Sequence, residues 1–392
     1  MNKNSALRKA VLDNANCRAS FCLQIILFCG VRISCYAGSM QNISELRRDI
    51  VSGDWVVIAT GRARRPNEFA KAKPPLFTQP KISCPFEKLH SDALLVHSDG
   101  DNRKNSPTFA KATEGKWWVQ AIPNKYPAFG KGICDLSHKV GPYQWTEGVG
   151  FHEVVVTRDH NRSIAQMTDR EAELLVQAYH DRYVALKDGA CVRYISIFHN
   201  HGRNSGASIS HPHSQIIAIP VIPPDVGHSL KGSAEYYHKH KACVHCVMLG
   251  YELKAKARLI YQNNGFVALA PFASKTAFEI RIFPKGHYAQ FETLGDKGRR
   301  AFANTLRVTL AKLYRGLKNP DYNYFIHTAP VDPIRNNSSN RASVKKEYEH
   351  YHWHLEILPK TAIWAGFEIG TGIEISTIAP ETASQFLRRI KV

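Results

Sequence analysis

Long apolar runs are absent from this sequence of 392 residues, and no stretch approaches the ~20 apolar residues that a membrane-spanning helix requires. Acidic residues are also in short supply, since 33 Asp and Glu stand against 52 Lys and Arg and leave a formal net charge of +19. A basic balance of this size indicates an anionic partner, but none of the motifs of nucleic-acid-binding modules is present. Charge alone does not choose among a phosphorylated metabolite, nucleic acid and a membrane surface, because the basic residues are spread along the chain. We expect neither nucleic acid nor a membrane as the partner.

Cysteine is scattered rather than concentrated. The nine cysteines form an odd set without a dense framework, in a chain too long to need disulfides for its stability. This usage predicts a reducing, cytoplasmic compartment in which the cysteines are free or bound to metal. The nine are Cys17, Cys22, Cys29, Cys35, Cys84, Cys134, Cys191, Cys243 and Cys246.

The first 39 residues differ in character from the rest. They contain five basic residues against one acid, and an apolar run follows at 21–31. A basic start before a short apolar segment is typical of a signal peptide, although Gln24 interrupts the run. Met40, in contrast, opens a segment that looks like a natural start. We therefore expect residues 1–39 to be a disordered or non-native extension without a functional role.

The body of the chain contains an internal repeat, because residues 150–220 and 277–360 show the same order of expected elements and histidines. Each repeat begins with a strand that leads to a histidine, continues with an amphipathic helix and a second strand, and closes on a His-x-His strand. This order predicts an α+β fold of two tandem halves, 40–232 and 233–392, with antiparallel sheets packed by helices. The expected strands lie at 153–156, 194–198, 211–217, 278–283, 322–326 and 352–357, and the expected helices begin at Thr168 and include 302–317.

The second half contains a predicted metal site. Cys243 and Cys246 form a C-x-x-C turn, and His287 and His352 can complete a tetrahedral Cys₂His₂ site for zinc. His245 lies inside the same turn and is an alternative ligand. The competing interpretation is a pair of buried cysteines without a metal.

The first half contains the equivalent set of Cys84, Glu87, His160 and His211, in which Glu87 stands where the second half has a cysteine. A carboxylate can bind zinc, but this harder ligand weakens a site that prefers sulfur. His90 could substitute, or this site could have lost its metal. A metal in either half would fix loops around the active strand rather than perform chemistry.

The segment 211–215, His-Pro-His-Ser-Gln, is the sharpest motif. Alternation along a strand places His213 and Gln215 on one face, and Pro212 should set the start of the strand at an edge or a bend. A neutral imidazole is a competent nucleophile toward phosphorus if an acceptor such as a backbone carbonyl holds its other nitrogen. Gln215 could then donate to a phosphate oxygen. The small, polar loop at 200–210 could bring backbone N–H groups against phosphates.

Several motifs together resemble galactose-1-phosphate uridylyltransferase and its relatives in the histidine-triad superfamily, over about 44–391 of the chain. The residues that support this resemblance are 54–58 (DWVVI), 61–66 (GRARRP), 124–127 (NKYP), 211–215 (HPHSQ) and 366–368 (GFE). The resemblance implies two tandem histidine-triad-like halves, one or two structural zinc ions and a homodimer.

The resemblance also implies a ping-pong transfer of UMP between UDP-glucose and galactose 1-phosphate, through a covalent uridylyl group on His213. The partners would then be a nucleotide sugar and a sugar 1-phosphate. The residues that it places in the nucleotide and phosphate site are Arg62, Arg65, Asn124, Asn200, Ser208 and Gln215, and Glu368 matches a residue that helps to hold the hexose.

The sequence departs from the best-known uridylyltransferases at Glu87, at Ser214 and in the stretch 370–374 (GTGIE). Ser214 and this stretch look more like the plant-type ADP-glucose phosphorylase, so an adenylyltransferase that uses ADP-glucose and phosphate is a rival hypothesis. A nucleotide-sugar hydrolase and a metal-stabilised binding protein without turnover are two others. The presence of both His213 and Gln215 argues against the binding protein, and the long duplicated architecture argues against a small hydrolase.

Overall fold

The computed structural model describes residues 44–59, 61, 66–69, 77–98, 117–134, 137–331 and 347–392. These residues belong to one compact unit that spans 42–392. The predictions for residues 1–39, Arg62 and Arg65 fall outside the described residues. Among the described helices, none combines the length and the apolar character needed to cross a membrane.

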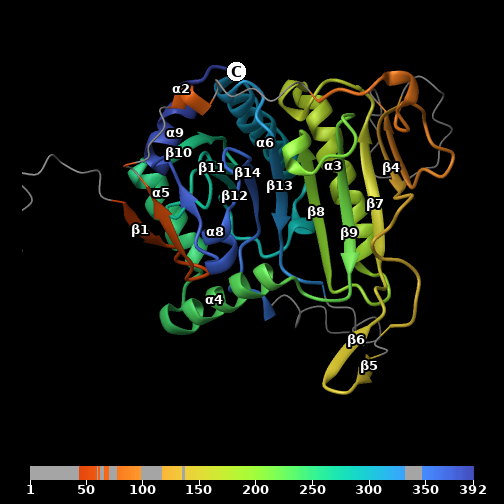
Figure 1. The fold of residues 1–392 in the computed structure, drawn as a ribbon, viewed down its shortest axis with the longest axis horizontal. Coiled ribbons are helices and arrows are strands. Elements are labelled where there is room, and N and C mark those ends of the chain that lie inside the picture. Colours follow the sequence, from red (N-terminus) through yellow and green to blue (C-terminus); the bar gives the residue numbers. More distant parts are fainter. Residues whose placement is uncertain are drawn as a thin grey trace, which may run out of the picture. The chain divides into compact units, whose positions relative to one another are not determined.

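A ten-stranded antiparallel sheet forms the centre of the fold (Figure 1). Its strand order is β10-β11-β12-β14-β13-β8-β9-β7-β4-β3. In chain order these strands are β3 (Leu95–Ser98), β4 (Trp117–Pro123), β7 (Phe151–Thr157), β8 (Tyr194–His201), β9 (His213–Ile219), β10 (Leu259–Gln262), β11 (Phe266–Leu269), β12 (Ile280–Pro284), β13 (Tyr322–His327) and β14 (His354–Pro359).

The strand order is symmetrical about its middle. Reading outward from the pair β8–β13, each half adds its His-x-His strand, then its first repeat strand, then two outer strands. The seam is antiparallel, with Phe198 opposite Phe325. The α+β fold with antiparallel sheets is thus confirmed, and the two predicted sheets are joined edge to edge into one. The predicted boundary at residue 232, which lies within helix α4 (Pro224–His240), stays a prediction.

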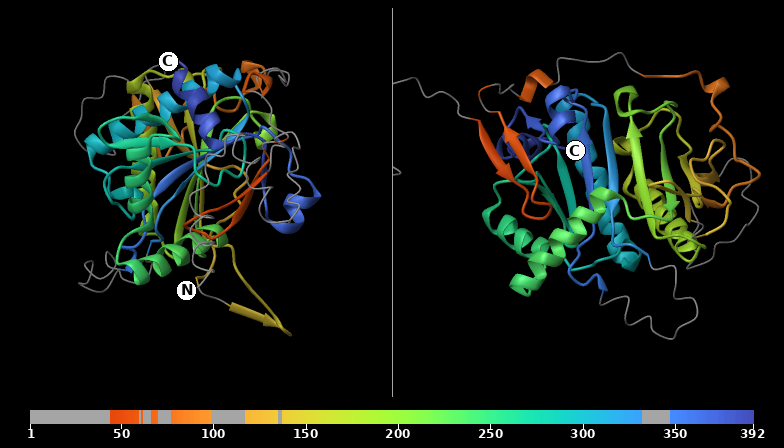
Figure 2. Two further views of the ribbon diagram at one scale, coloured as in Figure 1. Left: turned by 90° about the vertical axis from the view of Figure 1, so that its left-hand side faces the viewer. Right: turned by 60° about the horizontal axis from the view of Figure 1, so that its bottom comes forward.

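Two long helices cover the same face of this sheet: α3 (Asp169–Lys187) packs on the first half and α6 (Asp296–Leu317) on the second (Figures 1 and 2). Thr168 begins α3 as predicted, because its hydroxyl accepts from the Glu171 N–H while the Glu171 carboxylate accepts from the Thr168 N–H. The two helices also contact each other, and their apolar faces share one continuous core with the sheet. The opposite face of the sheet is left to the functional residues.

Shorter elements surround the sheet. A three-stranded sheet combines β1 (Glu45–Arg48), β2 (Trp55–Ile58) and β15 (Ile375–Ser376), and a separate hairpin combines β5 (Ser137–Val140) and β6 (Tyr143–Thr146). The remaining helices are α2 (Pro66–Phe69), α4, α5 (Val244–Ala255), α8 (Gly366–Thr371) and α9 (Pro380–Arg389), with 3₁₀ turns at Lys81–Ser83, Ile164–Gln166, Arg203–Ser205 and Phe291–Thr293.

One expectation about the cysteines is wrong. Cys134, after β4, and Cys191, just before β8, form a disulfide with 5.4 Å between their Cα atoms, so these two are neither free nor bound to metal. They are 57 residues apart, and nothing in the scattered cysteine pattern singles them out as a pair. The disulfide connects the segment that follows Asn124 with the turn that precedes β8.

Candidate active site

His213 is the first residue of β9, directly after Pro212 and the bend at 208–211. Its side chain is 9% exposed, and its Nδ1 donates to the backbone carbonyl of His211 over 2.8 Å. This bond places the ring proton on Nδ1 and leaves the lone pair on Nε2. Among the described residues, Nε2 has no hydrogen-bond partner. The imidazole is therefore oriented with its nucleophilic nitrogen directed away from the strand.

The environment of His213 keeps the ring neutral. Burial lowers the pKa of His213 below its ordinary value, and the hydrogen bond to His211 opposes this shift only in part. The Phe86 ring lies 5.2 Å from the imidazole, centroid to centroid, and contributes to this desolvation. A neutral imidazole is the form that can attack phosphorus.

A buried polar network holds β9 from its other face. The Ser214 hydroxyl lies 2.5 Å from the Tyr179 hydroxyl and 3.0 Å from Nδ1 of His199, and Tyr179 continues to Tyr324 over 2.6 Å. Tyr179 belongs to α3, Tyr324 to β13 and His199 to β8, so the network joins β9 to the helix layer and to the second half. This arrangement fixes the backbone between His213 and Gln215.

Gln215 shares the face of His213 and contacts a residue that the sequence analysis missed. Its Oε1 lies 2.7 Å from Nε2 of His152 on β7. The Asn124 backbone N–H donates to the His152 carbonyl, and Asn124 Nδ2 lies 3.0 Å from the same ring nitrogen. The structure thus brings Asn124 and Gln215 together through His152. Alternation along the predicted strand at 153–156, extended by one residue, is the signal that could have placed His152 on this face.

The polar loop after β8 is held in place by β13. Gly202 has φ +83°, and a Cβ at this position would overlap the Asp321 carboxylate, which accepts from the Asn204 N–H. Asn323 donates through its amide to Asn200 Oδ1 and to the Ser205 carbonyl. Asn200 is therefore fixed at the seam of the two halves.

Ser208 is exposed in the same loop, and its carbonyl accepts from the Gln79 amide. Gln79 pairs through its backbone and its side chain with Ser210, and its carbonyl lies 2.9 Å from Nε2 of His160. Gln79 thus connects the polar loop with the first predicted metal site.

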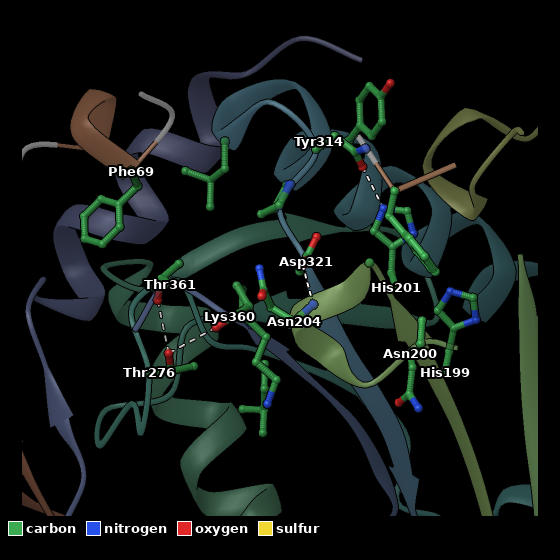
Figure 3. A pocket seen from close by; sticks show the side chains of 18 of the residues that line it. Phe69, His199, Asn200, His201, Asn204, Thr276, Tyr314, Asp321, Lys360 and Thr361 are labelled. Atoms are coloured by element: carbon green, nitrogen blue, oxygen red, sulfur yellow. Dashed lines mark hydrogen bonds between the residues drawn. The ribbon is translucent and has the colours of Figure 1, made fainter. Parts of the chain in front are cut away.

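A cavity of about 980 Å³ lies at the end of the sheet where β8 ends and β13 begins (Figure 3). It reaches Pro212, the neighbour of His213, and includes Asn200. Its other walls combine lysines and aromatic rings, which suit phosphate groups and a base or sugar. The lysines are Lys275, Lys318 and Lys360, and the rings include Phe69, Phe77, Tyr314 and Trp364.

The second half brings all four predicted ligands together. The ligand atoms of Cys243, Cys246, His287 and His352 lie within 4.8 Å of one another. Cys246 Sγ is 3.3 Å from Nδ1 of His287 and 3.5 Å from Nδ1 of His352. A tetrahedral zinc ion with Zn–S about 2.3 Å and Zn–N about 2.0 Å gives S···N edges of about 3.5 Å, so the set fits zinc. His245 is not a member of this group.

The first half brings its four ligands together in the same way. Cys84 Sγ lies 3.5 Å from Nδ1 of His211, and Glu87 Oε1 lies 3.4 Å from that nitrogen and in contact with Nδ1 of His160. His90 is engaged elsewhere, since its Nε2 lies 2.8 Å from the Pro85 carbonyl. Glu87 therefore occupies the ligand position, and this set also fits a zinc ion with a mixed S, N and O environment.

All four histidines of these groups share one orientation. Each directs Nδ1 toward the other ligands and places Nε2 against a backbone carbonyl, which fixes the tautomer that a metal requires. The carbonyls belong to Gln79 for His160, Thr157 for His211, Glu349 for His287 and Pro284 for His352. This repeated arrangement is a physical reason to regard both groups as metal sites.

A third group occupies the position in the second half that corresponds to His213 and Gln215. It consists of His327, His354 and Glu356, which lie close enough to hold an ion. Glu356 Oε1 lies 3.0 Å from Nε of Arg281 and 3.2 Å from Nε2 of His354. Burial alone would raise the pKa of Glu356, but Arg281, His354 and His327 together hold it well below its ordinary value. The sequence analysis missed this group, although the spacing His354-x-Glu356 copies His213-x-Gln215.

Glu368 is not brought to His213. It lies on the exposed helix α8, where its carboxylate accepts from the Ala365 N–H, and it does not line the cavity. Its predicted role in holding the hexose stays a prediction.

Comparison with known proteins shows which family this chain belongs to. Residues 37–223 match the family described as galactose-1-phosphate uridyl transferase, N-terminal domain. The chain is 32% identical to the ADP-glucose phosphorylase of Arabidopsis thaliana (90% of this chain, 95% of that protein) and 28% identical to a galactose-1-phosphate uridylyltransferase of Thermotoga maritima (89% and 99%). A crystal structure of the Arabidopsis thaliana ADP-glucose phosphorylase with bound ADP-glucose is similar at 30% identity and TM-score 0.70, over 89% of this chain and all of that one. The chain therefore belongs to the galactose-1-phosphate uridylyltransferase family and is an enzyme of the nucleotidyltransferase class.

Proposed function

We propose that this protein transfers a nucleoside monophosphate from a nucleotide sugar to a phosphate acceptor through a covalent intermediate on His213. The observation that supports the proposal most directly is the orientation of His213. Its Nδ1 proton is bound by the His211 carbonyl, its ring is held neutral by burial, and its Nε2 is left to react.

In the first step, Nε2 of His213 attacks the α-phosphorus of the nucleotide sugar. The bond from this phosphorus to the bridging oxygen breaks, and the sugar 1-phosphate leaves with the electron pair. In the second step, a phosphate oxygen of the acceptor attacks the same phosphorus, and the N–P bond breaks and returns the lone pair to Nε2. The Gln215 amide donates to a non-bridging oxygen as charge develops. Asn124, Asn200 and Ser208, with Arg62 and Arg65, bind the nucleotide and phosphates.

For the substrate pair, we give first place to ADP-glucose and inorganic phosphate. The supporting observation is the similarity to the ADP-glucose phosphorylase, which exceeds that to the uridylyltransferase of Thermotoga maritima in sequence identity. Ser214 and the stretch 370–374, which look more like the plant-type ADP-glucose phosphorylase, also favour this pair. The second candidate is UMP transfer between UDP-glucose and galactose 1-phosphate, which the resemblance of the motifs implies and which the several relatives of that name support.

We assign zinc to the two four-ligand groups, where it would supply structural rigidity by joining loops that are far apart in sequence. A homodimer is part of the same proposal. The segment around Glu368 exposes several large apolar side chains, as an interface between two copies would require. These are Ile363, Trp364, Phe367 and Ile369.

Mass spectrometry of the intact protein tests the function and the base together. The protein is incubated with ADP-glucose or with UDP-glucose in the absence of an acceptor, and His213→Gly serves as the control. An acid-labile adduct of one nucleoside monophosphate, absent from the variant, establishes the covalent mechanism and identifies the base. Release of free nucleoside monophosphate without any adduct would instead indicate a hydrolase.

A further inference from the structure

His152 stands between a fixed backbone donor and the amide of Gln215. Its Nδ1 accepts from the Ala128 N–H over 3.1 Å, and its Nε2 lies 2.7 Å from Gln215 Oε1. His152 is half-buried on β7, so its position is set by the sheet rather than by a surface loop. The three groups form a chain that ends at the residue expected to stabilise the transferred phosphoryl group.

The backbone donor decides the tautomer of this ring. An amide N–H can only donate, so the Ala128 contact requires a lone pair on Nδ1 of His152. The neutral ring then holds its proton on Nε2, which must donate to an oxygen. Gln215 therefore accepts this bond through Oε1. Its NH₂ group, which is the only donor of the Gln215 side chain, faces away from His152. The approach of Asn124 Nδ2 to Nε2 is consequently a contact between two donors and not a hydrogen bond.

The sheet and a short loop hold both ends of this chain. β7 pairs with β9 so that His152 lies opposite Ile217 and Val154 opposite Gln215, which makes His152 and Gln215 diagonal neighbours on one face. The loop that presents Ala128 is closed by bonds from Gly130 N–H to the Gly148 carbonyl and from Gly150 N–H to the Gly130 carbonyl. The geometry is therefore imposed before any substrate binds.

We propose that His152 is a positioning residue that orients the Gln215 amide, so that its NH₂ group meets the non-bridging oxygen of the transferred phosphoryl group. The inference rests on the proposed function. Without this partner the Gln215 amide is free to turn, so its NH₂ group is no longer held toward the phosphate and its oxygen can face and repel the developing charge. Loss of His152 should then slow the chemical step while leaving the affinity for the nucleotide sugar nearly unchanged.

The test is the rate of nucleotidylation of His213 in a single turnover, followed by mass spectrometry of quenched samples at several concentrations of ADP-glucose or UDP-glucose. The variants are His152→Ala, His152→Gln, Gln215→Ala and the double variant His152→Ala/Gln215→Ala. His138→Ala is the matched control, because His138 lies on β5 of the separate β5–β6 hairpin, where its ring stacks on Trp145. Thermal unfolding and metal content verify that each variant is folded.

We expect Gln215→Ala to slow nucleotidylation by about 100-fold, the usual cost of one transition-state donor, and His152→Ala by about 10-fold, with half-saturating concentrations within about threefold of the parent. His152→Gln, whose amide can still donate to Oε1, should recover part of the rate. The double variant should be no slower than Gln215→Ala, because His152 acts only through Gln215.

Three results would overturn the inference: an unchanged rate in His152→Ala, an equal loss in His138→Ala, or losses that multiply in the double variant. If the unsubstituted protein forms no adduct with any nucleotide sugar, the proposed function fails first. The long-range ¹H–¹⁵N spectrum of the histidine rings then still tests the geometry, because a His152 signal with the proton on Nδ1 contradicts the tautomer.

Discussion

The two halves of the molecule build the same His-x-His strand and surround it differently. In the first half, His213 has one nitrogen bound to a carbonyl, and a neutral Gln215 stands two residues on. In the second half, His354 has Nδ1 against the His352 carbonyl and Nε2 against Glu356. Both nitrogens of His354 are thus occupied, whereas Nε2 of His213 has no hydrogen-bond partner among the described residues.

The charged side chains around the His-x-His strand of the second half differ from those around His213. Arg281 lies 3.1 Å from Asp49 and 3.0 Å from Glu356, and all three side chains are buried. Burial opposes ionisation of Asp49, but Arg281 and the hydrogen bonds from the Val51 and Ser52 N–H groups together lower the pKa of that carboxyl. Where the first half has Gln215, the second half has Glu356, which forms a buried ion pair with Arg281 on the neighbouring strand. The same backbone therefore carries an ion-paired cluster in the second half and, under the proposed function, the reactive histidine in the first.

The largest expected effect comes from removing the two equivalent histidines in turn. His213→Gly should abolish nucleotidylation and turnover and leave the fold and metal content intact, because Nε2 is the attacking atom. His354→Gln should retain turnover within about threefold, since His354 directs no nitrogen at a substrate. Steady-state rates and adduct formation measure both. Normal turnover in His213→Gly would rule out the mechanism.

Gln215→Glu gives the first half the side chain of the second. A carboxylate cannot donate to a phosphate oxygen and repels it, so the rate of nucleotidylation should fall by at least about 100-fold. Intact-mass kinetics with ADP-glucose or UDP-glucose measure the change, and the thermal unfolding temperature serves as the control for folding. A rate close to that of the parent would show that Gln215 does not act on the transition state.

Periodicity and spacing were sufficient to predict much of this arrangement. The helix that begins after Thr168, the two His-x-His strands and both four-ligand groups follow from residue type and local pattern. The contact between His152 and Gln215 could not be predicted, because it depends on the register of two strands whose residues are 63 positions apart. The disulfide and the seam between β8 and β13 were missed for the same reason: both depend on long-range pairing. The roles of the predicted site residues stay predictions.

The first candidate metal group has Glu87 where the second has Cys246. We expect this difference to give the first group the lower affinity for zinc. A chelator should remove metal from the first group before the second, because thiolate holds zinc more strongly than carboxylate. Loss of metal should lower the unfolding temperature more than it lowers the initial rate. Metal analysis during dialysis, with Cys246→Ala and Glu87→Cys as the variants, measures the order. An immediate, reversible loss of activity without unfolding would instead indicate a catalytic metal.

Glu356→Gln tests whether the ion cluster stabilises the second half. The substitution gives this half the residue that the first half has, but leaves Arg281 with Asp49 and Glu279 only. Removing one partner from a buried ionic group should cost on the order of 3 kcal/mol in the free energy of unfolding. Denaturation in urea measures this cost, and nucleotidylation should remain. An unchanged stability would mean that the other two carboxylates compensate fully.

The smallest effect concerns pH and the network behind β9 in the first half. Burial, reinforced by neighbouring His201, holds the pKa of His199 well below its ordinary value of 6.5, so the folded protein keeps this ring neutral. The unfolded chain takes up the proton near pH 6.5, and the folded state is therefore at its full stability above that pH and loses stability as the pH falls. Between pH 7.0 and 5.5 the loss from His199 should be roughly 1 kcal/mol. Urea denaturation at both pH values, compared with His199→Asn, isolates this contribution, because the variant should lose that much less over the same interval. Equal losses in the two proteins would show that His199 does not couple stability to pH.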